Sequence, residues 1–145
     1  MKHRILIVDD DEIFLRPLRR TLEAAGFDVL AAASGEDAID LLKRDDVDLV
    51  VSDRRLPGID GVELVRRIKA DHPDLAVVVM TAYGTIESAV EAMRLGALDY
   101  LVKPFEPVEA LMVIRRAIEF QELKAANRAT IRRNQERFTL RNVLT

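Results

Sequence analysis

Five short runs of aliphatic residues alternate with longer segments of helical periodicity, and this alternation is the strongest constraint on the fold. The runs cover residues 5–8, 29–32, 47–52, 75–80 and 98–102. Continuous apolar runs of this kind are typical of parallel strands that are buried on both faces. The expected helices cover about residues 13–25, 35–44, 61–70 and 85–95, and a long one begins near Pro107 and runs to about residue 137. Strict strand–helix alternation predicts an α/β fold with a parallel sheet between helices.

The number of strands narrows the architecture. Five strands fit a flavodoxin-like, doubly wound sheet of order 2-1-3-4-5 better than a closed barrel, which needs eight. In such a sheet the ligand site lies at the carboxyl ends of the strands, where the strand order reverses between the first and third strand. The residues that directly follow the strands are therefore the candidates for function.

Composition excludes several classes of function. The chain has 145 residues, 49% of them hydrophobic and 32% charged, as expected of a folded globular protein. It has no cysteine, which rules out disulfides, thiolate metal centres and thiol nucleophiles. Its two histidines, His3 and His72, are too far apart in sequence to suggest a multi-histidine metal site. No apolar stretch is long enough for a signal-peptide core or a membrane span, so the expected compartment is the cytoplasm.

Charged and polar residues follow four of the five expected strands. They are Asp9, Asp10 and Asp11 after the first strand, Asp53 after the third, Thr81 after the fourth and Lys103 after the fifth. Like charges in a shared site raise one another's pKa, so we expect a bound hard cation, a nearby ammonium, or both. Oxygen ligands with room for water favour Mg²⁺ over zinc or copper. Lys103 supplies the ammonium.

This set of residues is suited to phosphoryl transfer. An aspartate can act as a covalent nucleophile, and a metal ion and an ammonium neutralise charge on the transferring oxygens. Thr81 can then donate a hydrogen bond to the phosphoryl group. Taken singly, a triple aspartate is usually a solvated helix start, and Asp53 a turn residue. Their joint placement on neighbouring strands is what favours a site.

Four stretches resemble the receiver domain of two-component response regulators. They read ILIVDDD (5–11), SDRRLPGIDG (52–61), VMTA (79–82) and GALDYLVKPF (96–105), and the resemblance covers about residues 3–120. It implies that a partner histidine kinase phosphorylates Asp53. It also implies a Mg²⁺ site formed by Asp9, Asp10, Asp53 and the backbone carbonyl of Arg55. Such a domain is not an enzyme with turnover, but a phosphoacceptor that assists its own phosphorylation and dephosphorylation.

The resemblance further implies a switch. Thr81 and Lys103 contact the phosphoryl group, Tyr100 is the switch aromatic, and the Lys103–Pro104 bond is cis. Movement of Thr81 and rotation of Tyr100 then change the face formed by the fourth helix, fifth strand and fifth helix, which controls dimerisation or an output domain. Arg55 and Tyr83 either tune the lifetime of the phosphorylated state or are ordinary loop residues. Asp11 has no separate role in this pattern and is expected to begin the first helix.

Residues 81–101 resemble the nitrogen-regulator C type of receiver, which precedes an ATPase domain and a DNA-binding domain. The chain has no phosphate-binding P-loop, and residues 121–145 are too few for a helix-turn-helix domain. We therefore divide it into a receiver domain (1–120) and a basic helical linker or tail (121–145) that is a possible dimerisation helix. The tail carries a net charge of +4 and the rest −7. A heptad through Phe120, Leu123, Asn127 and Asn134 is poor.

Several alternatives remain at this stage. A fragment that lacks its output domain, which acts in transcriptional regulation, is favoured over a stand-alone receiver. A haloacid dehalogenase-like phosphatase would share Asp9-x-Asp11, but it needs a threonine where this chain has Ile13. A flavin carrier would need a phosphate-binding loop where three aspartates lie. We expect no membrane association, and no direct nucleic-acid contact even from the basic tail.

Overall fold

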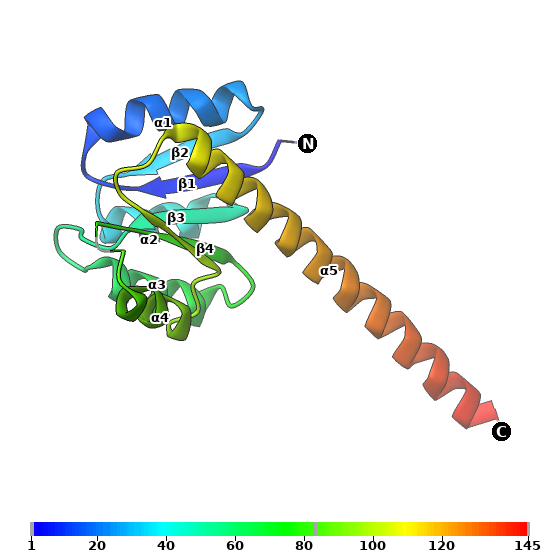
Figure 1. Ribbon diagram of the computed structural model, residues 1–145. Helices are drawn as coiled ribbons and strands as arrows, with labels where there is room; N and C mark the ends of the chain where they lie inside the picture. The colour runs from blue at the N-terminus through cyan, green and yellow to red at the C-terminus, as the bar shows by residue number, and fades with distance from the viewer. Residues whose placement is uncertain (1, 83, 145) are drawn as a thin grey trace.

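The computed structural model describes residues 2–82 and 84–144, with side chains described up to residue 127. Its sheet has five parallel strands in the order β2-β1-β3-β4-β5 (Figure 1). The predicted strand order is thereby confirmed. The strands are β1 (Arg4–Val8), β2 (Asp28–Ala32), β3 (Leu49–Asp53), β4 (Ala76–Thr81) and β5 (Asp99–Val102).

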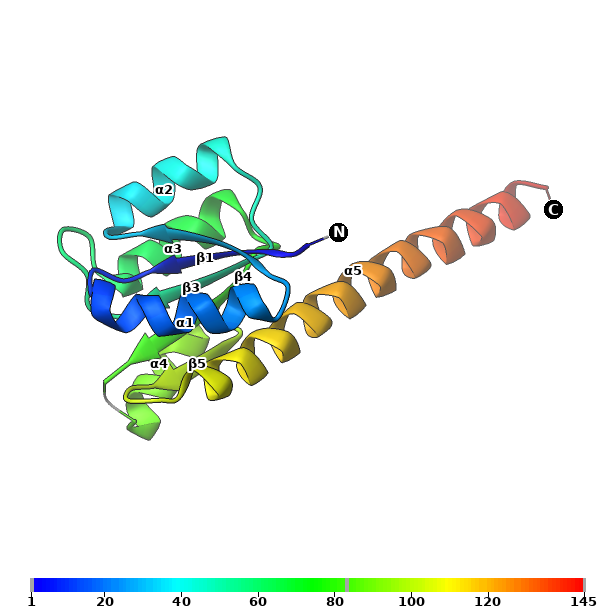
Figure 2. The same ribbon diagram turned by 90° about the horizontal axis from the view of Figure 1, so that it is seen from above.

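Helices cover both faces of this sheet (Figure 2). They are α1 (Glu12–Ala24), α2 (Gly35–Arg44), α3 (Gly61–Asp71), α4 (Ile86–Arg94) and α5 (Pro107–Leu144). Buried residues of α1 and α5 share one hydrophobic cluster, and those of α2, α3 and α4 share the other. The fold is therefore the doubly wound, flavodoxin-like α/β class that the alternation predicts.

Alternate residues of the central strands supply the two clusters. Ile5 and Ile7 of β1 pack with α1 and α5, whereas Leu6 and Val8 pack with the helices of the other face, and all four are fully buried. Successive side chains of a strand point to opposite faces, so a strand covered on both sides must be apolar throughout. This requirement explains the uninterrupted apolar runs in the sequence.

Short polar side chains begin the helices. Asp11 accepts hydrogen bonds from the backbone N–H groups of Ile13 and Phe14 and so caps α1, as expected from the sequence. Ser34 caps α2 in the same way, by accepting from Asp37 N at 3.1 Å. Such caps satisfy backbone donors that the first helical turn leaves free.

The last helix continues well beyond the sheet (Figures 1 and 2). It begins at Pro107, as predicted, but ends at Leu144 and not near residue 137. Its first turns pack on the sheet through Ile114 and Ile118, which are buried, and Leu111, which is partly buried. Side chains from residue 128 onward, including Asn134 of the suggested heptad, lie outside the described residues. Among the described residues no helix is both long and apolar enough for a bilayer crossing.

Candidate functional site

The carboxyl edge of the sheet brings the predicted site residues together. Val8 of β1 is paired with Ser52 of β3, and Thr81 of β4 with Val102 of β5. Residues that end or directly follow these strands, namely Asp9, Asp10, Asp53, Thr81 and Lys103, therefore lie along one edge. Parallel strands impose this arrangement, because all their carboxyl ends face the same way.

Lys103 connects two of the aspartates. Its Nζ donates a hydrogen bond to Oδ2 of Asp9 at 2.7 Å and another to Oδ2 of Asp53 at 3.1 Å. These ion pairs join residues that are 94 and 50 positions apart in the sequence. The Asp9 carboxylate is almost completely buried, with 1% of its side chain exposed, whereas that of Asp53 is 14% exposed. The Asp53 carboxylate is thus the one that a reactant can reach more readily.

An aromatic ring also contacts the lysine. Nζ of Lys103 lies 4.3 Å from the centroid of the Phe14 ring, within the range of a cation–π contact. Phe14 in turn packs edge-to-face against Phe105, with ring centroids 5.3 Å apart. Neither ring has a role that the sequence predicts. Phe105 lies two positions after Lys103, at the end of a stretch that resembles the receiver family, but nothing in the sequence connects Phe14 to it.

Three carboxylates form a possible metal site. Oxygen atoms of Asp9, Asp10 and Asp53 all lie within 4.8 Å of one another. The donors are all oxygens, which suits a hard divalent cation and not zinc or copper. Asp11 is not in this group, because its carboxylate caps α1. The residues present therefore fit a bound cation of the kind that the sequence predicts.

Burial and charge act in opposite directions on these groups. Burial raises the pKa of Asp9, and the hydrogen bonds from Lys103 and from the backbone N–H of Asp11 offset this only in part. Burial lowers the pKa of Lys103, but the hydrogen bonds to Asp9 and Asp53 and the negative charges of these two residues together outweigh burial, so the pKa is raised. Lys103 thus stays an ammonium, and a second positive charge would further relieve the cost of the buried Asp9 carboxylate.

A close backbone approach fixes the position of Asp53. The N–H of Gly61, at the start of α3, donates to the carbonyl of Arg54 at 2.9 Å. A Cβ atom at position 61 would lie 2.7 Å from Cα of Arg54 and would overlap the carbonyl oxygen of Asp53. Any larger residue would push α3 away from the end of β3. Arg55 follows on the exposed loop, and its N–H donates to Asp53 Oδ1 at 3.3 Å.

The residues of the predicted switch share one small cavity. Thr81 is buried at the end of β4, Tyr100 is half-buried on β5, and both line a void of about 10 Å³. Glu91 and Ala92 of α4 and Leu95, which directly follows this helix, line it as well. The Lys103–Pro104 bond is cis, as the resemblance implies. Tyr83, the second residue suggested to tune the lifetime, lies outside the described residues.

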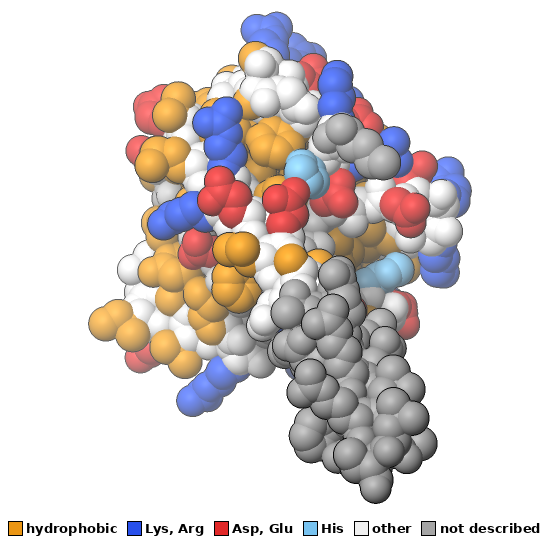
Figure 3. Space-filling model, turned by 90° about the vertical axis from the view of Figure 1, so that its right-hand side faces the viewer, with side chains coloured by type: hydrophobic (Ala, Val, Ile, Leu, Met, Phe, Trp, Pro, Cys, Tyr) orange, Lys and Arg blue, Asp and Glu red, His pale blue; other side chains and the backbone are white. Residues whose placement is uncertain are grey.

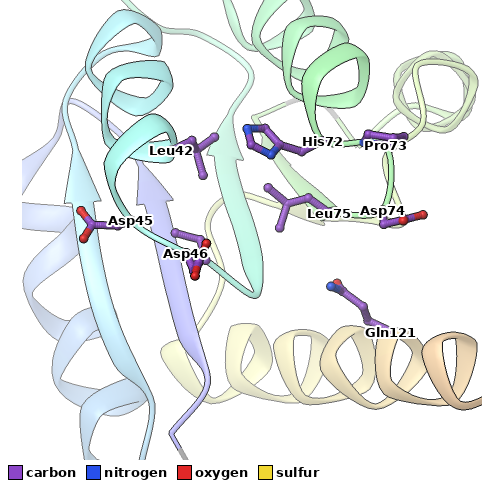
Figure 4. A pocket seen from close by; sticks show the side chains of 9 residues that line it. Leu42, Asp45, Asp46, His72, Pro73, Asp74, Leu75 and Gln121 are labelled. Atoms are coloured by element: carbon purple, nitrogen blue, oxygen red, sulfur yellow. The ribbon is translucent and has the colours of Figure 1, made fainter.

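A larger hollow lies at the opposite edge of the sheet. It encloses about 300 Å³ and is lined mainly by the loops that precede β3 and β4, together with Gln121 (Figure 4). Acidic side chains gather on this face around the point where α5 leaves the domain (Figure 3). None of the predicted site residues lines this hollow. The predicted site residues therefore lie at the carboxyl edge and not at this one.

The strand order and the contact between Asp53 and Lys103 agree with the resemblance to receiver domains. The family model of the response regulator receiver domain matches residues 5–115. The chain therefore belongs to this family, whose members act as phosphorylation-dependent signalling switches.

The relatives place the chain in the nitrogen-regulator C-like subgroup. It is 44% identical to the response regulator protein FleR of Pseudomonas aeruginosa over 116 residues. The aligned residues cover 80% of this chain and 24% of FleR. It is 41% identical over 126 residues to the DNA-binding transcriptional regulator NtrC of Klebsiella pneumoniae, 86% of this chain and 27% of NtrC. The chain thus spans about a quarter of these relatives.

Solved structures agree with this placement. The crystal structure of NtrX from Brucella abortus superposes with a TM-score of 0.82 at 34% identity, over 87% of this chain and 29% of NtrX. A CheY-like receiver domain protein from Methanospirillum hungatei superposes with a TM-score of 0.80 at 30% identity, over 86% of this chain and 99% of its own. The predicted receiver family and its subgroup are therefore confirmed.

Proposed function

We propose that Asp53 accepts a phosphoryl group from the phosphohistidine of a sensor histidine kinase. The observation that carries the proposal is the cluster at the carboxyl edge, where the partly exposed Asp53 carboxylate is held by Lys103 beside Asp9 and Asp10. An oxygen of Asp53 attacks phosphorus, and a P–O bond forms as the P–N bond breaks. The imidazole keeps the electron pair of that bond and takes up a proton.

The remaining residues stabilise the charge that moves in this step. Lys103 places its ammonium 3.1 Å from Oδ2 of Asp53, where it can pair with a phosphoryl oxygen. The buried Thr81 hydroxyl lies along the same edge and is the proposed donor to the phosphoryl group. Asp9, Asp10, Asp53 and the carbonyl of Arg55 are the proposed ligands of Mg²⁺. When bound, the cation neutralises charge on the transferring oxygens.

Acetyl phosphate provides a test of this function without the kinase. With Mg²⁺ present, we expect intact mass spectrometry to show one phosphoryl group on each chain, because a single carboxylate is activated. Removal of divalent cations with EDTA is expected to reduce the adduct to the level of a control without donor. A chain that releases phosphate repeatedly from a phosphate ester without forming an adduct would contradict the proposal and favour the phosphatase interpretation.

The proposed output surface is the α4–β5–α5 face. It carries exposed hydrophobic side chains on each of the three elements, namely Ile86, Val90, Met93, Val102, Val108 and Met112. Ile86 is 84% exposed, and Val108 and Met112 are each 61% exposed. Groups of exposed apolar side chains on neighbouring elements favour an interaction surface. We propose that Thr81 and Tyr100 change this face, and that a second copy or an output domain binds it.

The helix beyond the receiver is the proposed dimerisation element. Phe120 and Leu123 are exposed where α5 leaves the sheet, and the helix continues to Leu144 without Gly or Pro. We propose residues 1–120 as the receiver and 121–145 as a linker to an output domain that regulates transcription. NtrC, which this chain resembles, is a DNA-binding transcriptional regulator. A stand-alone receiver that acts through protein contacts is the alternative.

Light scattering with chromatography tests the dimer. With Mg²⁺ and the phosphate mimic beryllofluoride, we expect the full chain to shift from monomer toward dimer, because the mimic stabilises the active form of the α4–β5–α5 face. Met112→Glu, which places a charge on the exposed face, is expected to prevent the shift. Lys43→Glu is an exposed change on α2, away from the α4–β5–α5 face, and serves as the control. Monomers under all conditions would contradict the proposal.

A further inference from the structure

We infer that the ion pair between Arg54 and Glu91 is a positioning contact that holds α4 against the phosphoacceptor strand and so restrains the switch. The inference rests on the proposed function of Asp53, Thr81 and Tyr100. Nη2 of Arg54 lies 2.8 Å from Oε2 of Glu91, and the two residues are 37 positions apart in the sequence. The contact therefore joins the residue directly after Asp53 to the middle of α4.

One end of this contact is fixed. The backbone N–H of Arg54 donates to the carbonyl of Met80 at 2.8 Å, and the Arg54 carbonyl accepts from Gly61 at 2.9 Å. The main chain of Arg54 is thus held by β4 on one side and by the start of α3 on the other. Because this end cannot move easily, the ion pair acts mainly on the position of Glu91 and of the helix that carries it.

The other end is weakly packed. Within α4, Ala92 is the one residue that is buried, and Ile86, Val90 and Met93 are exposed. An element with few buried apolar contacts shifts at low free-energy cost. A single ion pair therefore contributes a larger share of the forces on α4 than it would on α1 or α5, which are anchored by several buried side chains.

The contact lies on the wall of the cavity that the switch uses. Arg54 and Glu91 both line the void that Thr81 and Tyr100 line. Its volume of about 10 Å³ is close to the minimum for one water molecule and is far too small for a phenol ring. Tyr100 can turn further inward only if the α4 wall, with Glu91, Ala92 and Leu95, moves outward. The Arg54–Glu91 pair opposes that movement.

Loss of the pair should therefore raise the population of the active arrangement before any phosphorylation. A partly exposed ion pair of this kind shifts an equilibrium by about two- to fivefold. If acetyl phosphate reacts with the active arrangement, the initial rate of adduct formation rises by the same factor. Single substitutions also change the local charge, so the pair must be isolated by a double-mutant cycle.

The cycle uses Arg54→Gln, Glu91→Gln and the double variant, with initial rates of adduct formation followed by intact mass. Charge effects alone would make the two single-variant factors multiply to the factor of the double variant. If the pair is a restraint, each single variant releases α4 completely, and the product of the two factors exceeds that of the double variant by about two- to fivefold.

Glu87→Gln is the matched control. Glu87 lies on the same helix as Glu91, and together with Arg54 and Glu91 it lines a further hollow at the protein surface. A cycle of Arg54→Gln with Glu87→Gln should show independent effects. Independent effects of Arg54→Gln and Glu91→Gln would overturn the inference while leaving the proposed function intact. No adduct on the unsubstituted chain would remove the proposed function and the inference together.

Discussion

Substitution of Asp53 by asparagine is expected to abolish the phosphoryl adduct that acetyl phosphate forms in the presence of Mg²⁺. An amide is not a nucleophile toward phosphorus under these conditions, and it lacks the charge that pairs with Lys103 and a cation. The fold should be retained, since asparagine has nearly the same shape and keeps one oxygen, which can still accept from the Arg55 N–H that Oδ1 of Asp53 accepts from. Intact mass after equal incubation, together with circular dichroism, measures both effects.

Asp60→Asn is the matched control for this substitution. Asp60 lies in the same loop, and its Oδ1 accepts from Glu63 N at 2.9 Å as the cap of α3. Asparagine caps helices about as well as aspartate, so this variant should fold and keep the adduct. If Asp53→Asn formed the adduct at the rate of the unsubstituted chain, another residue would be the acceptor and the proposed site would be wrong.

The architecture was accessible from the sequence because the physics that sets it is local. Buried parallel strands need continuous apolar runs, and the five runs lie within a few residues of the observed strands. The grouping of Asp9, Asp53 and Lys103 also followed, because a parallel sheet brings all its carboxyl ends to one edge. Their individual roles came from the family resemblance and stay predictions.

Contacts between distant side chains were not accessible in this way. Arg54 has no feature that distinguishes it from Arg55 in the sequence, yet it contacts Glu91 on α4. Phe14 contacts Lys103 because α1 and α5 pack together on one face of the sheet, and this packing depends on residues far apart in the sequence. The end of α5 was misplaced for a different reason. No glycine or proline follows Pro107, so nothing in the sequence marks a helix end before residue 144.

Replacement of Lys103 by methionine is expected to slow adduct formation from acetyl phosphate by about a hundredfold. Loss of one preorganised charge partner in a reacting site typically costs about 10²–10³ in rate. Lys69→Met is the matched control, because Lys69 is also a partly buried lysine and its Nζ donates to the carbonyl of Leu75 at 2.7 Å, remote from the carboxyl edge. Its rate should stay close to that of the unsubstituted chain.

The Lys103→Met variant also distinguishes the effects of two positive charges on the acidic cluster, namely the Lys103 ammonium and a bound cation. Without Lys103, the buried Asp9 loses its ion-pair partner at 2.7 Å, and its carboxylate depends on protonation or on a cation for compensation. We therefore expect Mg²⁺ to raise the melting temperature of Lys103→Met by more than it raises that of the unsubstituted chain. An equal response of both chains to Mg²⁺ would show that ammonium and cation do not share these carboxylates. The carboxylates of Asp9 and Asp53 accept hydrogen bonds from Lys103, and the same two carboxylates lie beside Asp10 in the candidate metal site. We therefore expect the ammonium and the cation to share them.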